Sequence, residues 1–304
     1  MAFARPSIHT PVSRPAKAPT PRRRPVPPLA PFTSASPVVK WAGGKSRLLA
    51  ELCARAPAAF DRYFEPFAGG AALYFRLAPA TAILADVNRD LIATYQTLAG
   101  AVEEVIVALA EHRDRHSKAH YYAVREAWND PGAKTSQIAR AAAFIYLNKT
   151  CYNGLWRVNR RGLFNVPMGR YSAPRIFDPH ALRAAARALR RAQLIAAPYA
   201  EVIAEAAAGD FIYFDPPYQP LSTTANFTSY SRDAFAEDDQ AALAQNARDL
   251  AERGCHVMVS NSDTPLIREL YADFHIATVK CARAINSKGS CRGQVNEVII
   301  TARR

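Results

Sequence analysis

The stretch that most constrains this chain is the apolar run 211–214, Phe-Ile-Tyr-Phe, which ends at the segment Asp215–Tyr218. The run shows no polar alternation, so it predicts a strand covered on both faces, which is typical of the centre of a parallel sheet. Ligands bind at the carboxyl edge of such sheets, where the chain leaves each strand. We therefore expect the four residues after the run to lie in a binding site of an α/β fold.

Those four residues combine groups that suit a planar ligand carrying an amine. Pro216 and Pro217 fix φ and lack backbone N–H groups, so the chain leaves the strand in a stiff turn with free carbonyls. Asp215 adds an ionised acceptor and Tyr218 adds a flat ring. An amino-bearing nucleobase fits such a receptor. The alternative is a strand without a binding site, in which the prolines only terminate the strand and the acid points to solvent.

The chemistry expected of this turn is group transfer to an exocyclic amine, which is a poor nucleophile because its lone pair is delocalised into the ring. If the carboxylate of Asp215 and the carbonyl of Pro216 accept the two amine hydrogens, the lone pair turns outward, toward an incoming methyl group. A base in a duplex must first be flipped out. The ring of Tyr218 can then replace the stacking that the base loses.

Two further segments predict a nucleoside-binding edge in the same sheet. Residues 63–72 read as a strand, a glycine turn and the start of a helix, and residues 82–85 read as a strand that ends at Asp86. In nucleoside-binding sheets, a carboxylate at the tip of the next strand holds ribose hydroxyls. Asp86 is therefore a candidate ligand of a nucleoside cofactor.

Residues 38–46 predict a short strand, a glycine turn and the start of a helix. Their Gly44-Lys45-Ser46 ending imitates a phosphate-binding P-loop. That motif needs a glycine where Val39 stands, so we reject a nucleoside triphosphate site in favour of an ordinary glycine turn.

The middle of the chain is predicted to be helical, over 102–115, 119–128 and 138–147. His112, His116 and His120 recur four residues apart, which places them on one predicted helical face. We favour a solvated basic face over a metal stripe, because no carboxylate or thiol completes a ligand set.

Residues 148–171 change character and predict a β-hairpin. Aromatic, amide and arginine side chains alternate around an Asn-Arg-Arg-Gly turn at 159–162. Such side chains suit the reading of base edges, because arginine pairs with guanine, amides pair with adenine and apolar groups meet thymine methyls. The alternative is a basic surface hairpin that touches only phosphates.

In the remaining segments, predicted helices and strands alternate again. Helices are predicted over 179–192, 199–208 and 237–253 and from Thr264, and strands over 193–198, 255–259, 275–279 and 297–301. Together the segments predict a doubly wound, mostly parallel sheet with an inserted helical and hairpin domain. The expected division is an arm at 1–37, a sheet domain at 38–100 and 193–304, and the inserted domain at 101–192.

The formal net charge of +13 favours a polyanionic partner. Residues 1–37 are rich in proline and arginine and contain no acid, so we expect a disordered arm, either a nonspecific DNA tether or an inert extension. The five cysteines form no Cys-x-x-Cys pair, and no run is apolar enough for a membrane span or a secretory signal. We expect a cytoplasmic protein that is monomeric in solution, without a disulfide framework or a zinc site.

Taken in order, the motifs resemble the Dam-type DNA adenine methyltransferases, which are α-group, N6-adenine-specific enzymes. The resemblance runs from residue 38 to the end and is carried by Lys40-Trp41-Ala42-Gly43-Gly44-Lys45, Glu65-Pro66-Phe67, Asp86-x-Asn88, Tyr152-Asn153-Gly154-Leu155-x-Arg157, Phe164-Asn165-Val166-Pro167-x-Gly169-Arg170-Tyr171 and Asp215-Pro216-Pro217-Tyr218. The chain departs from the family pattern at Ala71, where a glycine is usual, and at Lys149-Thr150.

The resemblance implies a methyltransferase sheet and methyl transfer, without a metal, from S-adenosylmethionine to a flipped adenine in double-stranded DNA, with GATC as the expected site. It implies that adenine is held by Asp215, Pro216, Pro217 and Tyr218, and the cofactor by Trp41, Lys45, Phe67, Gly69, Asp86 and Asp215. It also implies that Lys40 and Arg157 read guanines, Leu155 and Pro167 contact thymine, and Tyr152 fills the space that the flipped base leaves. Polar DNA contacts are implied at Asn153, Asn159, Asn165 and Arg170.

Two other classes of protein share part of this pattern. A methyltransferase acting on RNA or on a protein glutamine would share the fold, but the glutamine enzymes typically carry asparagine in place of Asp215, and neither explains the hairpin. A non-catalytic DNA-binding protein would keep the charge and lose the Asp215 turn.

Overall fold

A computed structural model describes residues 35–45, 47–220, 235–282 and 294–302 of the chain. The predicted arm at 1–37 lies almost wholly outside the described residues, and so do residues 221–232, for which the polar sequence predicts a loop. All statements below concern the described residues.

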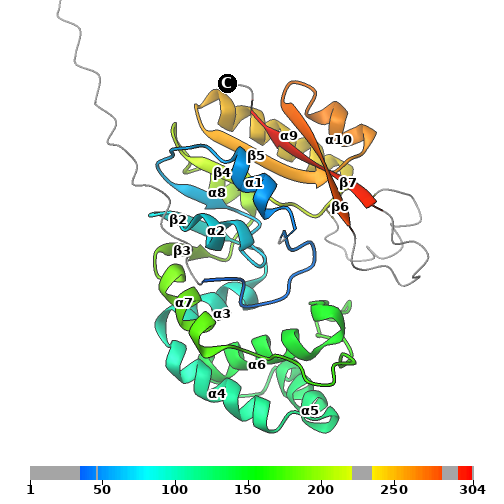
Figure 1. The fold of residues 1–304 in the computed structure, drawn as a ribbon. Helices are drawn as coiled ribbons and strands as arrows, with labels where there is room; N and C mark the ends of the chain where they lie inside the picture. The colour runs from blue at the N-terminus through cyan, green and yellow to red at the C-terminus, as the bar shows by residue number, and fades with distance from the viewer. Residues whose placement is uncertain (1–34, 46, 221–234, 283–293, 303–304) are drawn as a thin grey trace, which may run out of the picture.

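The described strands form one sheet in the order β3-β2-β1-β4-β5-β7-β6 (Figure 1). The strands are β1 (Tyr63–Glu65), β2 (Ala82–Ala85), β3 (Ala192–Ile195), β4 (Phe211–Phe214), β5 (His256–Ser262), β6 (His275–Ala282) and β7 (Gln294–Thr301). Neighbouring strands from β3 to β5 pair in parallel, whereas β7 pairs antiparallel with both β5 and β6. The predicted doubly wound, mostly parallel α/β sheet is confirmed.

The predicted central strand is β4, which pairs with β1 on one side and β5 on the other. Its residues alternate between two hydrophobic cores. Phe211 and Tyr213 pack in the core on one face of the sheet, and Ile212 and Phe214 pack in the core on the other. All four are at most 1% exposed. This two-sided burial explains why the run carries no polar residue.

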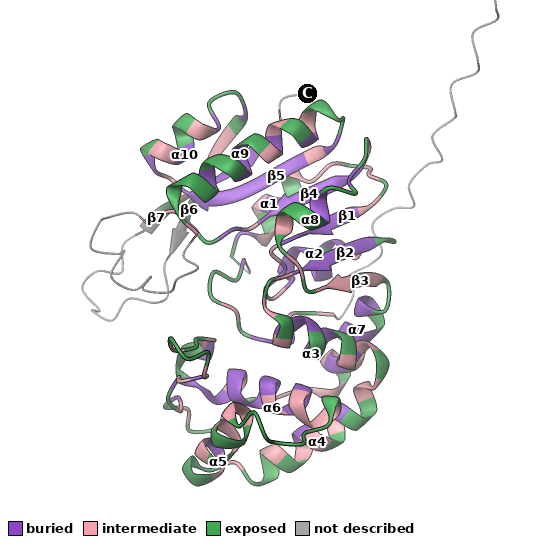
Figure 2. Ribbon diagram, turned by 180° about the vertical axis from the view of Figure 1, so that it is seen from behind, coloured by how far each residue is buried: buried purple, intermediate pink, exposed green. Residues whose placement is uncertain are grey.

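Ten α-helices and one 3-10 turn surround the sheet in the described residues. They are α1 (Leu49–Arg55), α2 (Ala72–Leu77), α3 (Arg89–Gly100), α4 (Val102–Asp114), α5 (Lys118–Asn129), α6 (Gln137–Thr150), η1 (Tyr152–Gly154), α7 (Pro179–Leu189), α8 (Tyr199–Ile203), α9 (Glu237–Glu252) and α10 (Pro265–Leu270). The core with Ile212 takes its helical residues from α8, α9 and α10, which lie before the sheet in Figure 2. Helices α1 to α7 contribute to the other core.

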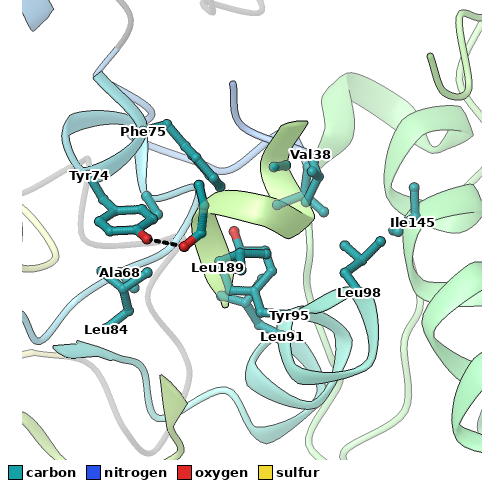
Figure 3. Packing of buried hydrophobic residues seen from close by; sticks show 14 of the residues in the cluster. Val38, Ala68, Tyr74, Phe75, Leu84, Leu91, Tyr95, Leu98, Ile145 and Leu189 are labelled. Carbon is teal, nitrogen blue, oxygen red and sulfur yellow. Dashed lines mark hydrogen bonds between the residues drawn. The ribbon is translucent and has the colours of Figure 1, made fainter. Parts of the chain in front are cut away.

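The second core continues from the sheet into the helical layer formed by α4, α5 and α6. Figure 3 shows Val38, Leu98, Ile145 and Leu189 meeting from four separate segments, and each is at most 5% exposed. No single described helix is long and apolar enough to cross a membrane, and only the bent pair α3 and α4 passes that test, by length and composition alone.

The short strand predicted at the start of residues 38–46 is wrong, because the described part of this segment forms bends and turns and pairs with no described strand. Its backbone is instead satisfied by the buried amide of Asn148 in α6. Lys40 donates its N–H to Asn148 Oδ1 at 2.7 Å, and Asn148 Nδ2 donates to the Lys40 carbonyl at 2.7 Å and to the Gly154 carbonyl at 3.2 Å. The Asn148 side chain therefore supplies backbone hydrogen bonds that a neighbouring strand would otherwise supply to this segment.

The predicted hairpin is present, although its first three residues belong to α6. Two isolated antiparallel bridges, Cys151 to Met168 and Val158 to Phe164, bring its arms together. The tip closes through the N–H of Gly162, which donates to the Asn159 carbonyl at 2.9 Å. Gly162 has φ of +75°, which a side chain rarely tolerates.

We predict that Asn148→Ala lowers the free energy of unfolding by about 2–4 kcal/mol, because it leaves a buried backbone carbonyl of Gly154 and partly buried backbone groups of Lys40 without partners. Urea unfolding followed by circular dichroism measures this change. Gln245→Ala, at an exposed position of α9, is the control and should change the stability little. Equal stabilities of the Asn148 variant and the wild type would contradict the bridging role.

Candidate functional site

The two predicted carboxylates lie at one edge of the sheet, on either side of β1. Phe64 in β1 pairs with Ile83 in β2 and with Ile212 in β4. Asp86 and Asp215 each stand three residues beyond these partners, so they reach the same level of the sheet. Two strand spacings amount to about 10 Å. Strands β2 and β4 thus deliver the two groups to either side of β1, and the strand order reverses between β1 and β4, which is where α/β sheets bind ligands.

Asp215 is a nearly buried carboxylate with two bonded neighbours. Its Oδ1 lies 2.6 Å from Lys45 Nζ, and the side chains of the pair are 19% and 6% exposed. Ser260 in β5 donates to the same oxygen at 3.0 Å, and the Ser260 hydroxyl is itself 2.9 Å from the Tyr213 hydroxyl. Burial raises the pKa of Asp215, and the Lys45 ammonium opposes that rise. The ion pair therefore favours the ionised acceptor.

Two acceptors of the turn remain open. Within the part of the chain that the structure describes, no hydrogen-bond partner is recorded for Asp215 Oδ2 or for the carbonyl of Pro216. The ring of Tyr218 lies nearby, because the same Lys45 ammonium stands 4.4 Å from its centroid. The Tyr218 hydroxyl donates to Glu297 Oε2 at 3.0 Å, which fixes one end of the ring. With respect to the described residues, the turn thus combines two unbonded acceptors with a held aromatic ring.

Asp86 accepts two backbone N–H groups, which hold its carboxylate at the tip of β2. Gly69 N–H donates to Oδ2 at 3.0 Å and Asn88 N–H donates to Oδ1 at 2.9 Å. Burial raises the pKa of Asp86, and these two hydrogen bonds work against the rise. The next residue, Val87, is 71% exposed, so an apolar surface lies free beside the acid. The sequence did not single out Val87.

Gly69 brings Trp41 to the same place. A Cβ added to Gly69 would stand 2.6 Å from Trp41 Cδ1, so only glycine allows this approach, and its φ is +46°. The Gly69 carbonyl accepts a hydrogen bond from the buried Tyr95 hydroxyl at 2.6 Å. Trp41 stacks on Phe144 of α6, with centroids 6.4 Å apart. Gly69 therefore contacts both Trp41 and Asp86, which places the two side chains at the same site.

Phe67 follows β1 between the two carboxylates and belongs to an aromatic cluster. Its ring stacks on Tyr199 at 5.1 Å and meets Phe235 edge-on at 5.8 Å. Tyr199 begins α8 four residues after the end of β3, and its place at the same strand edge was the signal that the sequence analysis missed. Ser260, at the end of the apolar part of β5, was missed for a similar reason, because only the folded sheet brings it to Asp215.

Lys40 lies against the hairpin, which connects the sheet edge to the predicted DNA-reading residues. Its Nζ donates to the Tyr171 hydroxyl at 3.2 Å and stands 4.3 Å from the centroid of that ring. Its aliphatic chain packs on Gly154, which has no room for a Cβ and a φ of +65°. The segment that begins at Lys40 and runs to Lys45 therefore spans from the hairpin to Asp215.

Most predicted DNA-contacting side chains are open to solvent. The exposed ones are Tyr152, Asn153, Arg157, Pro167 and Arg170, and the half-buried ones are Leu155, Asn159 and Asn165. Arg157 Nε donates to Asn165 Oδ1 at 3.0 Å across the hairpin, which orients the guanidinium. Asn159 Oδ1 instead accepts the N–H groups of Arg161 and Leu163 at 2.9 and 3.1 Å, so it shapes the tip.

The predicted histidine face is wrong, because the three residues do not share a helix. His112 lies in α4, His120 lies in α5 and His116 lies between them. The rings are half-buried around Tyr146 of α6, with His112 Nδ1 3.0 Å from His120 Nε2. Burial lowers the pKa of His112 to about 4, so the expected solvated basic face does not form. Among the described residues no group of three metal-ligating side chains occurs.

Glu65, at the end of β1, is a buried acid that the sequence analysis left without a role. It is 3% exposed, and its Oε2 accepts from the Tyr63 hydroxyl at 2.9 Å and the Tyr74 N–H at 3.2 Å. Burial raises the pKa of Glu65 to about 8, despite the hydrogen bond from Tyr63. Glu65 is therefore protonated at neutral pH and adds no second charge beside Asp215.

Comparison with known proteins gives consistent matches over most of the chain. A family model described as D12 class N6 adenine-specific DNA methyltransferase matches residues 41–285. The type II methyltransferase M1.LlaDCHI of Lactococcus lactis subsp. cremoris is 39% identical over 268 residues, which cover 87% of this chain and 94% of that protein. A DNA adenine methylase of Vibrio cholerae serotype O1 is 39% identical over 264 residues, covering 86% and 94%. That of Escherichia coli K12 is 38% identical over 263 residues, covering 86% and 93%.

We predict that Glu65→Gln changes how stability depends on pH. Between its ordinary pKa of 4.5 and about 8, the folded chain holds a proton at Glu65 that the unfolded chain has lost, so stability falls as the pH rises through this window. Glutamine keeps the acceptor and removes the titration. The stability of the variant relative to wild type should rise by about 1.4 kcal/mol per pH unit in that window.

Urea unfolding from pH 5 to pH 8 measures this difference. The exposed Glu104→Gln in α4 is the control and should follow the wild-type pH dependence. Stability curves that run parallel for the Glu65 variant and the wild type would show that Glu65 is ionised in the fold.

Proposed function

Because the chain belongs to the family of D12 class N6 adenine-specific DNA methyltransferases, we propose that it methylates a flipped adenine within GATC, with S-adenosylmethionine as donor. The family assignment establishes an adenine-specific DNA methyltransferase. The donor, the flipped state of the base, the recognition sequence and the residue roles are the proposed part.

The observation that carries the proposal is the pair of open acceptors beside a held ring. Asp215 Oδ1 is bound by Lys45 and Ser260, so Oδ2 is left for one amine hydrogen of adenine. The Pro216 carbonyl is left for the other. Two such bonds oppose delocalisation of the nitrogen lone pair and orient it away from the turn, which is positioning and electrostatic stabilisation in one step.

Tyr218 supports the extruded base in this mechanism. A base taken out of the duplex loses its stacking partners, and an aromatic ring in the pocket restores part of that energy. The hydroxyl bond to Glu297 holds the ring, and the ammonium of Lys45, 4.4 Å from the ring centroid and 2.6 Å from Asp215 Oδ1, supports an environment suited to N–H donors. The planar amine of adenine has the same donor chemistry.

The cofactor-binding residues proposed from the family likeness fit a nucleoside. Asp86 offers a carboxylate at the tip of β2, beside the exposed apolar side chain of Val87. Phe67 supplies an aromatic face, and Gly69 bonds Asp86 and packs against Trp41. S-adenosylmethionine, when bound, supplies an electrophilic methyl group. The position of Asp86 and Asp215 on either side of β1 lets one edge of the sheet serve both ligands.

We assign sequence reading to the helical and hairpin segment at 101–192. On the family pattern, Lys40 and Arg157 read guanines, Leu155 and Pro167 contact thymine, and Tyr152 enters the space left by the base. Tyr152 is 49% exposed although it is large and apolar, as expected of a ring that meets DNA. Asn153, Asn159, Asn165 and Arg170 complete the polar contacts of this proposal.

Transfer from labelled S-adenosylmethionine to synthetic duplexes tests the function directly. We expect label on adenine in a GATC duplex and little label when the central adenine is replaced. Plasmid treated with the enzyme should become resistant to a nuclease blocked by methylated GATC and stay sensitive to one that tolerates it. Label on single-stranded RNA alone would overturn the proposal, and label on a different DNA sequence would overturn GATC.

We predict that Asp215→Ala abolishes methyl transfer while DNA binding persists, because the carboxylate acts on the amine and the hairpin acts on the duplex. Radiolabel incorporation and fluorescence anisotropy with a labelled duplex measure the two properties. Asp238→Ala, an exposed acid in α9, is the matched control and should retain activity. Transfer by the Asp215 variant at the wild-type rate would remove this residue from the mechanism.

We predict that Arg157→Ala relaxes specificity at one guanine, with a loss of discrimination of about 1–3 kcal/mol. The comparison of transfer rates on GATC and on duplexes substituted at each guanine measures it. Arg161→Ala, in the exposed turn of the hairpin, is the control and should weaken all duplexes alike through lost phosphate attraction. A uniform loss in both variants would indicate that Arg157 contacts only the backbone.

A further inference from the structure

The turn after β4 has two fixed φ angles but lacks two backbone donors, so its remaining torsions depend on partners outside the turn. Pro216 and Pro217 lack N–H groups, so neither can donate to a carbonyl of the turn. Their rings fix φ at both positions and the peptide bonds are planar, which leaves ψ of Pro216 and ψ of Pro217 as the soft torsions. These torsions decide where the two proline carbonyls point. Whatever fixes them also fixes the proposed acceptor at Pro216.

A fully buried glutamine on a neighbouring helix holds the second of these carbonyls. Gln240 in α9 is 0% exposed, and its Nε2 donates to the Pro217 carbonyl at 2.8 Å. Its Oε1 accepts a hydrogen bond from Asn261 Nδ2 at 3.0 Å. With one end of the amide donating and the other accepting, only one orientation of the Gln240 amide satisfies both neighbours.

Asn261 in β5, which is bonded to Gln240 and is also 0% exposed, contacts the far end of the turn. Asn261 Oδ1 accepts the Gln219 N–H at 3.1 Å and the Ser262 N–H at 2.8 Å. Gln240 and Asn261 thus form one buried pair of amides, here called the relay, which binds both the Pro217 carbonyl and the Gln219 N–H. The residue before Asn261 is Ser260, which binds the Asp215 carboxylate at the near end.

We propose that Gln240 and Asn261 are positioning residues for methyl transfer, which set the direction of the Pro216 carbonyl through the anchored ends of the turn. This inference rests on the proposed function of that carbonyl as an acceptor for the adenine amine. Anchoring Pro217 O and Gln219 N–H, with Asp215 held by Ser260, leaves the peptide unit between the two prolines little freedom. The relay touches neither ligand and acts through the backbone.

The first test is Gln240→Leu, which keeps the size of the side chain and removes both hydrogen bonds. We expect the single-turnover rate of methyl transfer to fall by about 100-fold, because a misplacement of about 1 Å has an effect of that size. The affinities for S-adenosylmethionine and for a GATC duplex should stay within a few-fold of wild type. Gln245→Leu makes the same substitution at an exposed position of the same helix and is the control.

The second test is Gln240→Glu, which separates positioning from packing. An ionised glutamate still accepts from Asn261 but cannot donate to the Pro217 carbonyl, whereas a protonated glutamate does both. The ratio of the wild-type rate to the variant rate should therefore be large at pH 9 and shrink as the pH falls. The charged side chains bonded to the turn or its flanks, namely Lys45, Asp215, Glu237 and Glu297, are present in both proteins, so the introduced carboxylate is the only added titratable group.

The outcomes separate the inference from the proposed function. If the wild type methylates GATC and both Gln240 variants transfer methyl groups at the wild-type rate, the relay is not a positioning device. The Gln240 variants could instead lose only active fraction or melting temperature, while the rate constant per active site stays unchanged and the rate ratio does not depend on pH. That result would also overturn the inference and leave Gln240 a purely structural role. If the wild type itself fails to methylate any duplex, the proposed function falls instead.

Discussion

The structure depends on one nearly buried ion pair, between Lys45 and Asp215, at the end of the central strand. Burying a carboxylate is costly unless a partner and hydrogen bonds stabilise its charge, and here Lys45 and Ser260 both bind one oxygen. The pair also joins the segment after Lys40 to the strand edge, so the hairpin contact and the carboxylate belong to one connected structure. Protonation of Glu65 keeps a second negative charge away from this pair.

Side-chain amides hold the irregular segments that surround the ion pair. Asn148 binds the backbone of Lys40, Gln240 and Asn261 bind the turn after Asp215, and Asn129 binds both backbone groups of Phe164 in the hairpin. Buried backbone groups must find partners, and irregular segments have no neighbouring strand to supply them. Amides suit this task because each offers a donor and an acceptor. Binding segments are thereby kept both irregular and rigid.

Patterns with a strict local cause could be predicted from the sequence. The run 211–214 predicted a strand buried on both faces, and apolar periodicity predicted the three middle helices. Each of these patterns depends only on which side chains of a single element face the core. Segments whose partners are distant were predicted less well. The short strand expected at the start of residues 38–46 is wrong because the backbone partner there is an asparagine side chain. The histidine face is wrong because the chain turns between α4 and α5.

The sequence by itself determined the class of fold, the order of the motifs and the identity of the residues at the sheet edge, since these depend on local pattern and on which side chains are present. Only the tertiary structure decided which of those residues meet. Lys45 and Asp215 form an ion pair although they are 170 residues apart in the sequence. Gln240 in α9 and Ser260 in β5 contact the same turn. Such contacts arise from the packing of separate elements, and no local pattern carries that information.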